Sequence, residues 1–217
     1  MRTAKANASH IEAKETLSTV GGAPLRPFTG KYQRILEAAI SVFAEKGFHA
    51  ARISDVASRA SVADGTIYLY FRNKEELLMT AVNIAFDAFM SHARAELAAI
   101  ASPAGKLRRL AQLHLEALGS DRNLAIVFQM ELRHSPRFLA PFSRQHMTEY
   151  FDLVLQAIHE GQEQGVFRRN LPGAIVANCF FGALDEMVTS WVLDRSHYQL
   201  TEVAEITADV ILMGLER

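Results

Sequence analysis

The spacing of apolar residues predicts three helices near the start of the chain. From Lys31 onward, apolar side chains recur at intervals of three and four residues, as on one face of a helix. Gly47 stands where a left-handed C-terminal cap would end that helix. Ser54 can cap a short second helix over 55–60, and a third helix is expected over 65–71.

The rest of the chain continues the helical pattern, with caps and prolines at the boundaries. Asn73 followed by Glu76 resembles a capping box, which opens a long helix that ends near Ile100. Pro136 and Pro141 are expected to break the chain between two later helices. Five more helices are expected over 103–118, 123–133, 142–164, 172–193 and 201–215, and Ser102 and Pro103 supply a cap and a first-turn proline for the first of them. Because no strand alternation and no internal repeat occur, we expect an all-α protein of about nine helices.

Residues 1–28 lack this pattern. They are polar, carry few large apolar groups and finish in the sequence G-G-A-P-L-R-P over 21–27. Such a segment cannot bury enough surface to offset the entropy that is lost on ordering. We therefore expect a disordered arm over 1–28, a three-helix domain over 29–75 and a larger helical domain over 76–217.

The second and third helices, joined by a tight turn, have the proportions of a helix-turn-helix. In the third helix, Ile67 and Phe71 are four residues apart and face inward. Thr66 and Tyr70 then occupy a different face, and Tyr68 projects between the two faces. Because short hydroxyl groups can meet phosphate oxygens and base edges at close range, we expect this face to contact DNA.

Three neighbouring residues are further candidates for DNA contact. Gly65 lets the backbone approach closely, and its amide can donate to a phosphate, while Lys74 supplies a cation. Asp64 can cap the third helix or accept from a cytosine amino group, and capping is the commoner role. The alternative is that Tyr68 and Tyr70 are edge residues of an ordinary three-helix core.

The expected helix over 172–193 is apolar on more than one face. One stripe contains Val176, Phe180, Leu184, Met187 and Trp191. Other apolar residues widen this stripe beyond what a surface helix requires, so both sides of the helix need cover. The helix is therefore either central in a monomeric bundle or shared with a second subunit in a symmetric dimer.

Charge is distributed unevenly along the chain. The formal net charge is -1, but residues 1–75 carry 11 Lys and Arg against 7 Asp and Glu, whereas the remainder carries 12 against 17. A basic end suits a polyanionic partner at that end only. The single cysteine, Cys179, cannot form an internal disulfide, and neither a membrane span nor a signal peptide is evident. We expect a cytoplasmic protein.

No residue pattern indicates catalysis or metal binding. The eight histidines are scattered without a pair at helical spacing, and Cys179 has no histidine close in sequence. Asp185 and Glu186 lack a second catalytic group, so an ion-pair or hydrogen-bond role is the commoner one for them. We expect no catalytic residue, no metal ligand and no bound cofactor.

Three segments resemble the DNA-binding domain of the TetR family of bacterial repressors. They are K-Y-Q-R-I-L-E-A-A-I-S-V-F-A-E-K-G-F over 31–48, I-S-D-V-A-S-R-A over 53–60 and G-T-I-Y-L-Y-F-R-N-K-E-E-L over 65–77. The resemblance implies a homodimer in which Ser54, Thr66, Tyr68, Tyr70 and Lys74 face operator DNA. It also implies a subunit interface on the last two helices. The residues expected there are Val176, Phe180, Met187, Trp191, Ile206 and Val210.

The larger domain resembles the FadR-type members of that family, in N-L-A-I-V-F-Q-M-E-L-R-H-S over 123–135 and G-A-L-D-E-M-V-T-S-W-V-L over 182–193. Those members repress fatty-acid degradation genes and release DNA on binding long-chain acyl-CoA. A site for this ligand needs an apolar channel for the acyl chain and cations for the phosphates of CoA. The channel candidates are Phe86, Phe89, Met90, Leu110, Leu113, Phe151, Val154, Leu155, Phe180, Phe181 and Leu184. The candidate cations are Arg108, Arg109, Arg133, His134 and Arg137. The same apolar residues could form a solid core, and each arginine could be a solvated surface charge.

These observations predict a TetR-type homodimeric repressor that long-chain acyl-CoA releases from a palindromic operator. One alternative is a repressor of the same type that responds to another apolar ligand, for example in efflux control. A second alternative, from a different class, is an acyl carrier or hydrolase that does not bind DNA. A hydrolase needs a nucleophile beside a base, and we find no such pair.

Overall fold

A computed structural model describes residues 30–133, 135–194 and 198–216 of the protein. The predicted arm over 1–28 lies outside the described residues. Within those ranges the chain forms ten α-helices and two π-helical segments, and its only strand-like pairing is an isolated bridge between Phe167 and Glu216. The prediction of an all-α fold is confirmed.

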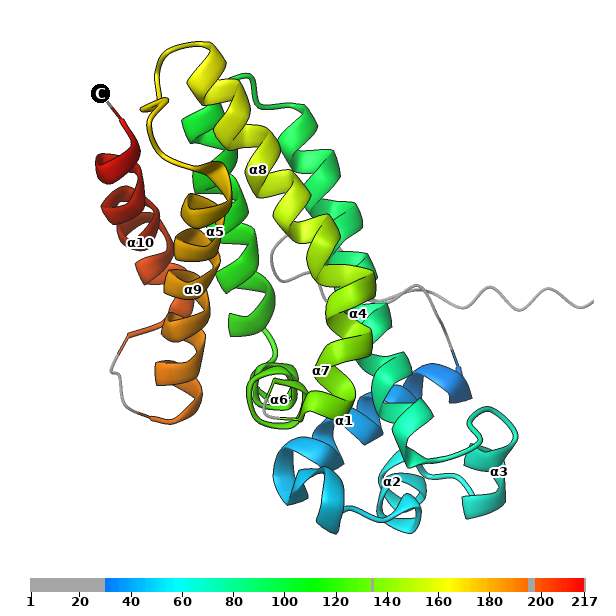
Figure 1. The fold of residues 1–217 in the computed structure, drawn as a ribbon. Helices are drawn as coiled ribbons and strands as arrows, with labels where there is room; N and C mark the ends of the chain where they lie inside the picture. Colours follow the sequence, from blue (N-terminus) through cyan, green and yellow to red (C-terminus); the bar gives the residue numbers. More distant parts are fainter. Residues whose placement is uncertain (1–29, 134, 195–197, 217) are drawn as a thin grey trace, which may run out of the picture.

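The first three helices, α1 (Lys31–Ala50), α2 (Ile53–Ala60) and α3 (Asp64–Tyr68), pack together at one end of the molecule (Figure 1). Their core includes Phe43, Val56 and Ile67. Gly47 has φ 75° and ψ 154°, so it interrupts α1 near the expected position and redirects its last residues.

Two local expectations in this region were wrong. Ser54 lies inside the first turn of α2 and does not cap it; instead the Arg52 N–H donates to Asp55 Oδ2 at 2.9 Å. The third helix ends at Tyr68, earlier than Phe71, because the chain continues in a turn where the Phe71 N–H donates to the Ile67 carbonyl at 3.0 Å.

Two long helices follow, with the caps that the sequence predicts. In α4 (Lys74–Ala98), the Asn73 side chain accepts from the Glu76 N–H at 2.8 Å, and in α5 (Pro103–Gly119), Ser102 Oγ accepts from the Gly105 N–H at 3.2 Å. α4 runs from the three-helix end to the far end of the molecule, and α5 packs against α4, α8, α9 and α10 (Figure 1).

The middle of the chain contains more helix than expected. α6 (Arg122–Ile126) continues into the π-helix η1 (Val127–Leu132), and α7 (Pro136–Phe142) continues through the π-helix η2 (Ser143–Met147) into α8 (Thr148–Glu163). The expected break at Pro136 is confirmed, because η1 ends at Leu132 and the next helix begins at Pro136, whereas the expected break at Pro141 was wrong. Pro136 occupies the first turn of α7, where its missing N–H has no intrahelical partner to lose. Pro141 lies within α7, and the chain changes to π-helical bonding immediately after that helix.

The last two helices, α9 (Gly173–Val192) and α10 (Leu200–Leu215), lie side by side on one outer face of the molecule (Figure 1). Both begin within one residue of the expected position. Throughout the described ranges, no helix combines the length and apolar character that crossing a membrane requires.

Candidate functional sites

The hydroxyl-bearing face predicted for the third helix lies at the surface. Tyr68 and Tyr70 are exposed, as are Ser54, Asp64 and Gly65, while Thr66 is half-buried. The Tyr70 ring packs edge-on against Tyr32 with centroids 5.5 Å apart, so this tyrosine has both a packed ring and an exposed surface. The predicted DNA-facing residues named here are therefore all at least partly accessible at the three-helix end.

Lys74 has intramolecular contacts that the sequence did not indicate. Its Nζ donates to the carbonyls of Ala51 at 2.8 Å and His49 at 3.2 Å, and it lies 4.6 Å from the centroid of the Phe48 ring. The ammonium therefore stabilises the end of α1 and ties it to the start of α4. Because an ammonium has three donors, one remains for a phosphate.

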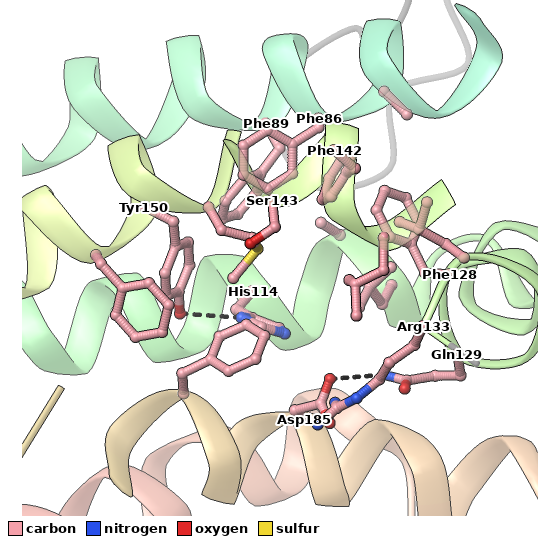
Figure 2. A pocket seen from close by; sticks show the side chains of 18 of the residues that line it. Phe86, Phe89, His114, Phe128, Gln129, Arg133, Phe142, Ser143, Tyr150 and Asp185 are labelled. Atoms are coloured by element: carbon pink, nitrogen blue, oxygen red, sulfur yellow. Dashed lines mark hydrogen bonds and ion pairs between the residues drawn. The ribbon is translucent and has the colours of Figure 1, made fainter. Parts of the chain in front are cut away.

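A cavity of about 430 Å³ lies among the helices from α4 to α9, including η1 and η2 (Figure 2). Its walls are mainly aromatic and aliphatic. Six phenylalanines line it: Phe86, Phe89, Phe128, Phe142, Phe151 and Phe181. The volume falls within the range of about 300–1,000 Å³ for small-molecule sites, and an apolar wall with few polar groups is typical of such sites.

One polar cluster lies where η1 meets α9. Asp185 is buried, accepts from Gln129 Nε2 at 3.0 Å and forms an ion pair with Arg133 (Figure 2). The Arg133 side chain remains 43% exposed and lines the cavity. Because the arginine offsets the charge of the buried carboxylate, the cluster gives an otherwise apolar space one charge-balanced polar edge.

A second polar pair lies elsewhere in the same cavity. His114 Nδ1 and the Tyr150 hydroxyl are 3.0 Å apart, and both residues line the cavity (Figure 2). Burial lowers the pKa of His114 to about 4 and raises the pKa of Tyr150. The pair is therefore neutral at pH 7.

Of the apolar residues predicted to bind the ligand, Phe86, Phe89, Phe151 and Phe181 line the cavity. The others are not part of the lining: the buried residues are Met90, Leu110, Leu113, Val154, Phe180 and Leu184, and Leu155 is half-buried. These side chains fill the spaces between α4, α5, α8 and α9, a role that the sequence cannot distinguish from that of lining a cavity.

Arg108 and Arg109 also lie outside the lining. Arg108 forms an ion pair with Asp209 of α10. The Arg109 guanidinium lies 3.2 Å from Glu96 and 3.4 Å from Glu116. Both arginines are thus engaged with carboxylates, of which Glu96 and Asp209 lie on neighbouring helices. Arg137 forms an ion pair with Glu75 outside the lining, and His134 lies outside the described residues. Arg133 is the predicted cation that reaches the cavity.

Sequence reasoning did not assign His114, Gln129, Tyr150 or Asp185 to the ligand site. His114 follows Leu113 on the apolar face of α5, and a histidine among apolar residues was the available signal. That signal identifies no partner, because Tyr150 is 36 residues away along the chain.

The outer face of α9 and α10 carries exposed apolar residues. The predicted interface residues Ile206 and Val210 are exposed on α10 together with Met213, and Ile175 is exposed on α9. Among the other predicted interface residues, Val176 and Phe180 are buried within the protomer, and Met187 and Trp191 are half-buried. These exposed side chains on neighbouring helices are therefore candidates for contact with a partner.

Two family models match the chain. Residues 35–80 match the model described as bacterial regulatory proteins of the tetR family, and residues 83–214 match the C-terminal region of YsiA-like proteins. Together these matches cover most of the described chain.

Individual relatives agree with the family matches. The fatty acid metabolism regulator protein of Bacillus subtilis is 33% identical over 85% of this chain and 95% of its own length. The crystal structure of FadR from B. subtilis in complex with stearoyl-CoA has a TM-score of 0.79, is 33% identical and covers 84% of this chain and 98% of that chain. The fatty acid degradation regulator FadR of Bacillus halodurans has a TM-score of 0.78 at 37% identity, covering 85% of this chain and all (100%) of that one.

Proposed function

Because the chain belongs to the TetR family of bacterial regulatory proteins, we propose that it is a homodimeric repressor released from operator DNA by long-chain acyl-CoA. The observation that carries this proposal is the phenylalanine-lined cavity of about 430 Å³, in a chain 33% identical to a regulator whose structure holds stearoyl-CoA. The relatives are regulators, so the protein is not an enzyme. The genes under its control are those of fatty-acid degradation, and it acts in the cytoplasm.

DNA binding is assigned to the domain over 29–75. The residues that face the operator are Ser54, Thr66, Tyr68, Tyr70 and Lys74. Gly65 and Asp64 lie at the start of α3. In a twofold dimer, two such helices enter successive major grooves roughly 34–36 Å apart, so the operator is palindromic.

The dimer interface is assigned to α9 and α10 in the domain over 76–217. The exposed side chains Ile206, Val210 and Met213 would be covered by the same surface of a second subunit. A twofold interface is self-complementary, and it buries an apolar face that a single protomer leaves in water.

The cavity is connected to the DNA-binding helices through η1 and α4. Gln129 and Leu132 of η1 line the cavity, and Glu131 between them accepts from the Phe48 N–H of α1 at 3.0 Å. A ligand that favours one position of η1 and α4 therefore changes the separation of the recognition helices. It can do so only through different affinities for the two arrangements.

The charge of the cavity lining supports a second candidate effector. Among the described residues that line the cavity, Arg133 is the one cationic side chain, and it is already paired with Asp185. A cavity edge with so little free positive charge also suits an apolar ligand without phosphates, as in a repressor that controls efflux.

A mobility shift on DNA from upstream of the protein's own gene tests the proposal. We expect the protein to retard a palindromic fragment, and hexadecanoyl-CoA to abolish the shift while free CoA does not. Release by hexadecanoate and hexadecanoyl-CoA at equal concentrations would favour the apolar effector without phosphates. Absence of any retardation at physiological salt would overturn the proposal and favour an acyl carrier.

A further inference from the structure

The cavity contains two polar side chains that a plain hydrocarbon chain does not need. His114 of α5 is 8% exposed and Tyr150 of α8 is 1% exposed. Their ring centroids are 5.6 Å apart, and Phe89 and Phe181 lie against both rings. Burying polar groups among aromatic rings is unfavourable unless hydrogen bonds compensate for the loss of water.

The hydrogen bond between the two side chains leaves part of their hydrogen-bonding capacity unused. It joins His114 Nδ1 to the Tyr150 hydroxyl, and the described residues supply no second hydrogen-bonding partner to either group. Figure 2 shows the other ring nitrogen of His114 turned away from Tyr150, toward the cavity. This nitrogen is therefore available to a ligand.

The number of free donors and acceptors on the pair does not depend on which group donates the shared proton. If the Tyr150 hydroxyl donates to Nδ1, then Nε2 of His114 carries a proton and is the free donor. If Nδ1 donates instead, the Tyr150 hydroxyl is the free donor and Nε2 accepts. In both tautomers the pair offers one donor and one acceptor.

The environment favours a neutral ligand group over a charged one. Burial keeps His114 uncharged and Tyr150 protonated at pH 7, so the pair supplies no charge to balance a carboxylate. Arg133, the cation of the cavity, is already paired with Asp185. A carbonyl or hydroxyl oxygen matches the pair, because it needs one or two hydrogen bonds and no counter-charge.

We propose that His114 and Tyr150 form a subsite that hydrogen-bonds a neutral oxygen of the ligand's acyl group. That oxygen is either the thioester carbonyl or a hydroxyl carried on the chain. This inference rests on the proposed function in taking the ligand to be an acyl group. An analogue without the oxygen leaves the buried pair unmatched, which is how a hydrogen-bonding site discriminates against such analogues.

The test compares ligands that differ in one oxygen, with affinities measured by isothermal titration calorimetry on the full chain. The CoA series is hexadecanoyl-CoA, S-hexadecyl-CoA, which lacks the carbonyl, and 3-hydroxyhexadecanoyl-CoA. The series without CoA is octadecanoate and 12-hydroxyoctadecanoate. Wild type should favour the matching oxygenated ligand about fivefold, the equivalent of one hydrogen bond.

Three variants establish whether the pair causes this preference. Tyr150→Phe removes the hydroxyl, so the two ligands of each pair should then bind with about equal affinity. His114→Leu removes the imidazole of the pair and should also abolish the preference. It therefore serves as the test if the Tyr150→Phe variant does not fold. Phe89→Leu is the matched control, since it alters an apolar wall beside the pair and should weaken all ligands while keeping the preference.

The two ligand comparisons distinguish the two sources of the oxygen. A Tyr150-dependent preference for hexadecanoyl-CoA over S-hexadecyl-CoA assigns the subsite to the thioester carbonyl. A Tyr150-dependent preference for a hydroxylated chain assigns it to a chain hydroxyl. Equal affinities within every pair of ligands, or a preference that survives both Tyr150→Phe and His114→Leu, would overturn the subsite.

The same data separate this inference from the proposed function. If CoA compounds do not bind but wild type favours 12-hydroxyoctadecanoate through Tyr150, the proposed effector is wrong and the subsite stands. If hexadecanoyl-CoA releases DNA but ligands with and without the oxygen bind with equal affinity in every pair, the proposed function stands and the subsite is wrong. If no compound of either series binds, both are wrong.

Discussion

Tyr70 illustrates, at the scale of single residues, how one side chain serves both the fold and the proposed DNA surface. Its ring packs edge-on against Tyr32 and lies beside Phe71, whereas 45% of the residue is exposed. The ring contacts position the side chain, and the hydroxyl group is the part proposed to donate to DNA. The two roles can therefore be separated by removing a single oxygen atom.

Tyr70→Phe should weaken operator binding by about 1 kcal/mol, the value of one hydrogen bond. The thermal unfolding midpoint should not change, because the ring contacts remain. Fluorescence anisotropy with labelled operator measures the first quantity, and circular dichroism measures the second. Unchanged operator affinity would contradict the assignment of this hydroxyl to DNA.

His114 should make stability depend on pH in a defined window. Burial lowers its pKa from 6.5 to about 4, so below pH 6.5 the unfolded chain binds a proton that the folded chain does not. Stability from this residue is therefore complete above pH 6.5 and is lost as the pH falls toward 4. Between pH 7.5 and 5 the loss amounts to about 2 kcal/mol.

Urea unfolding at pH 7.5 and pH 5 checks this prediction on wild type and His114→Leu. The variant lacks the titrating group, so its loss of stability over the same interval should be smaller by about 2 kcal/mol. His159→Leu, on α8 outside the cavity lining, is the control and should behave as wild type does. Equal pH dependence in wild type and His114→Leu would show that the buried ring does not titrate as described.

At the scale of elements, helix positions and most caps were predictable because they depend on local sequence. Asn73 and Ser102 cap the helices that they precede, as expected. The π-helical segments were not predictable, since one additional residue in a turn barely alters the spacing of apolar positions. Pro141 was misleading for a related reason: a proline's effect depends on its position, and Pro141 lies inside α7, whereas Pro136 begins that helix as a break predicts.

The candidate sites differ in predictability for the same physical reason. Most residues proposed to face DNA are close in sequence, on α3 or just after it, so periodicity alone separates exposed from buried side chains there. The cavity depends on packing between distant helices. Leu113 and His114 are adjacent, yet one lies in the core and the other lines the cavity, and Phe180 and Phe181 differ in the same way.

The element η1 provides a prediction about coupling between the sites. Glu131 accepts from the Phe48 N–H just after the interruption of α1 at Gly47. Glu131→Ala removes this acceptor without changing a residue of the cavity lining. Ligand affinity of the free protein should be unchanged, while the effect of ligand on operator affinity should fall about fivefold, or about 1 kcal/mol of coupling.

Glu131→Gln is the matched control for this prediction. Its amide oxygen can still accept from the Phe48 N–H, so coupling should remain close to that of wild type. Operator anisotropy with and without saturating hexadecanoyl-CoA gives the coupling for each variant. If Glu131→Ala retains the coupling of wild type, the bond does not connect the two sites.

At the scale of the whole molecule, the proposed activity requires two copies of the chain. α9 and α10 present apolar side chains on an outer face, remote from the DNA-binding helices in Figure 1. Val210 is 69% exposed in the protomer, so a substitution there tests association without disturbing the core.

Val210→Glu should give a folded monomer. A carboxylate on each subunit would be buried at the interface without a partner, which is strongly unfavourable. Sedimentation velocity should show the monomer, and operator affinity should fall about a hundredfold because two linked half-site contacts become one. Thr201→Glu, exposed at the start of α10, should remain dimeric. A dimeric Val210→Glu protein would place the interface elsewhere.

The central claim is that ligand in the cavity and operator on the recognition helices oppose each other. Titration calorimetry of hexadecanoyl-CoA into the free protein and into its operator complex tests this claim most directly. Thermodynamic linkage predicts weaker ligand binding in the complex, by the same factor by which the ligand weakens operator binding. Identical ligand affinities in the two titrations would contradict the account.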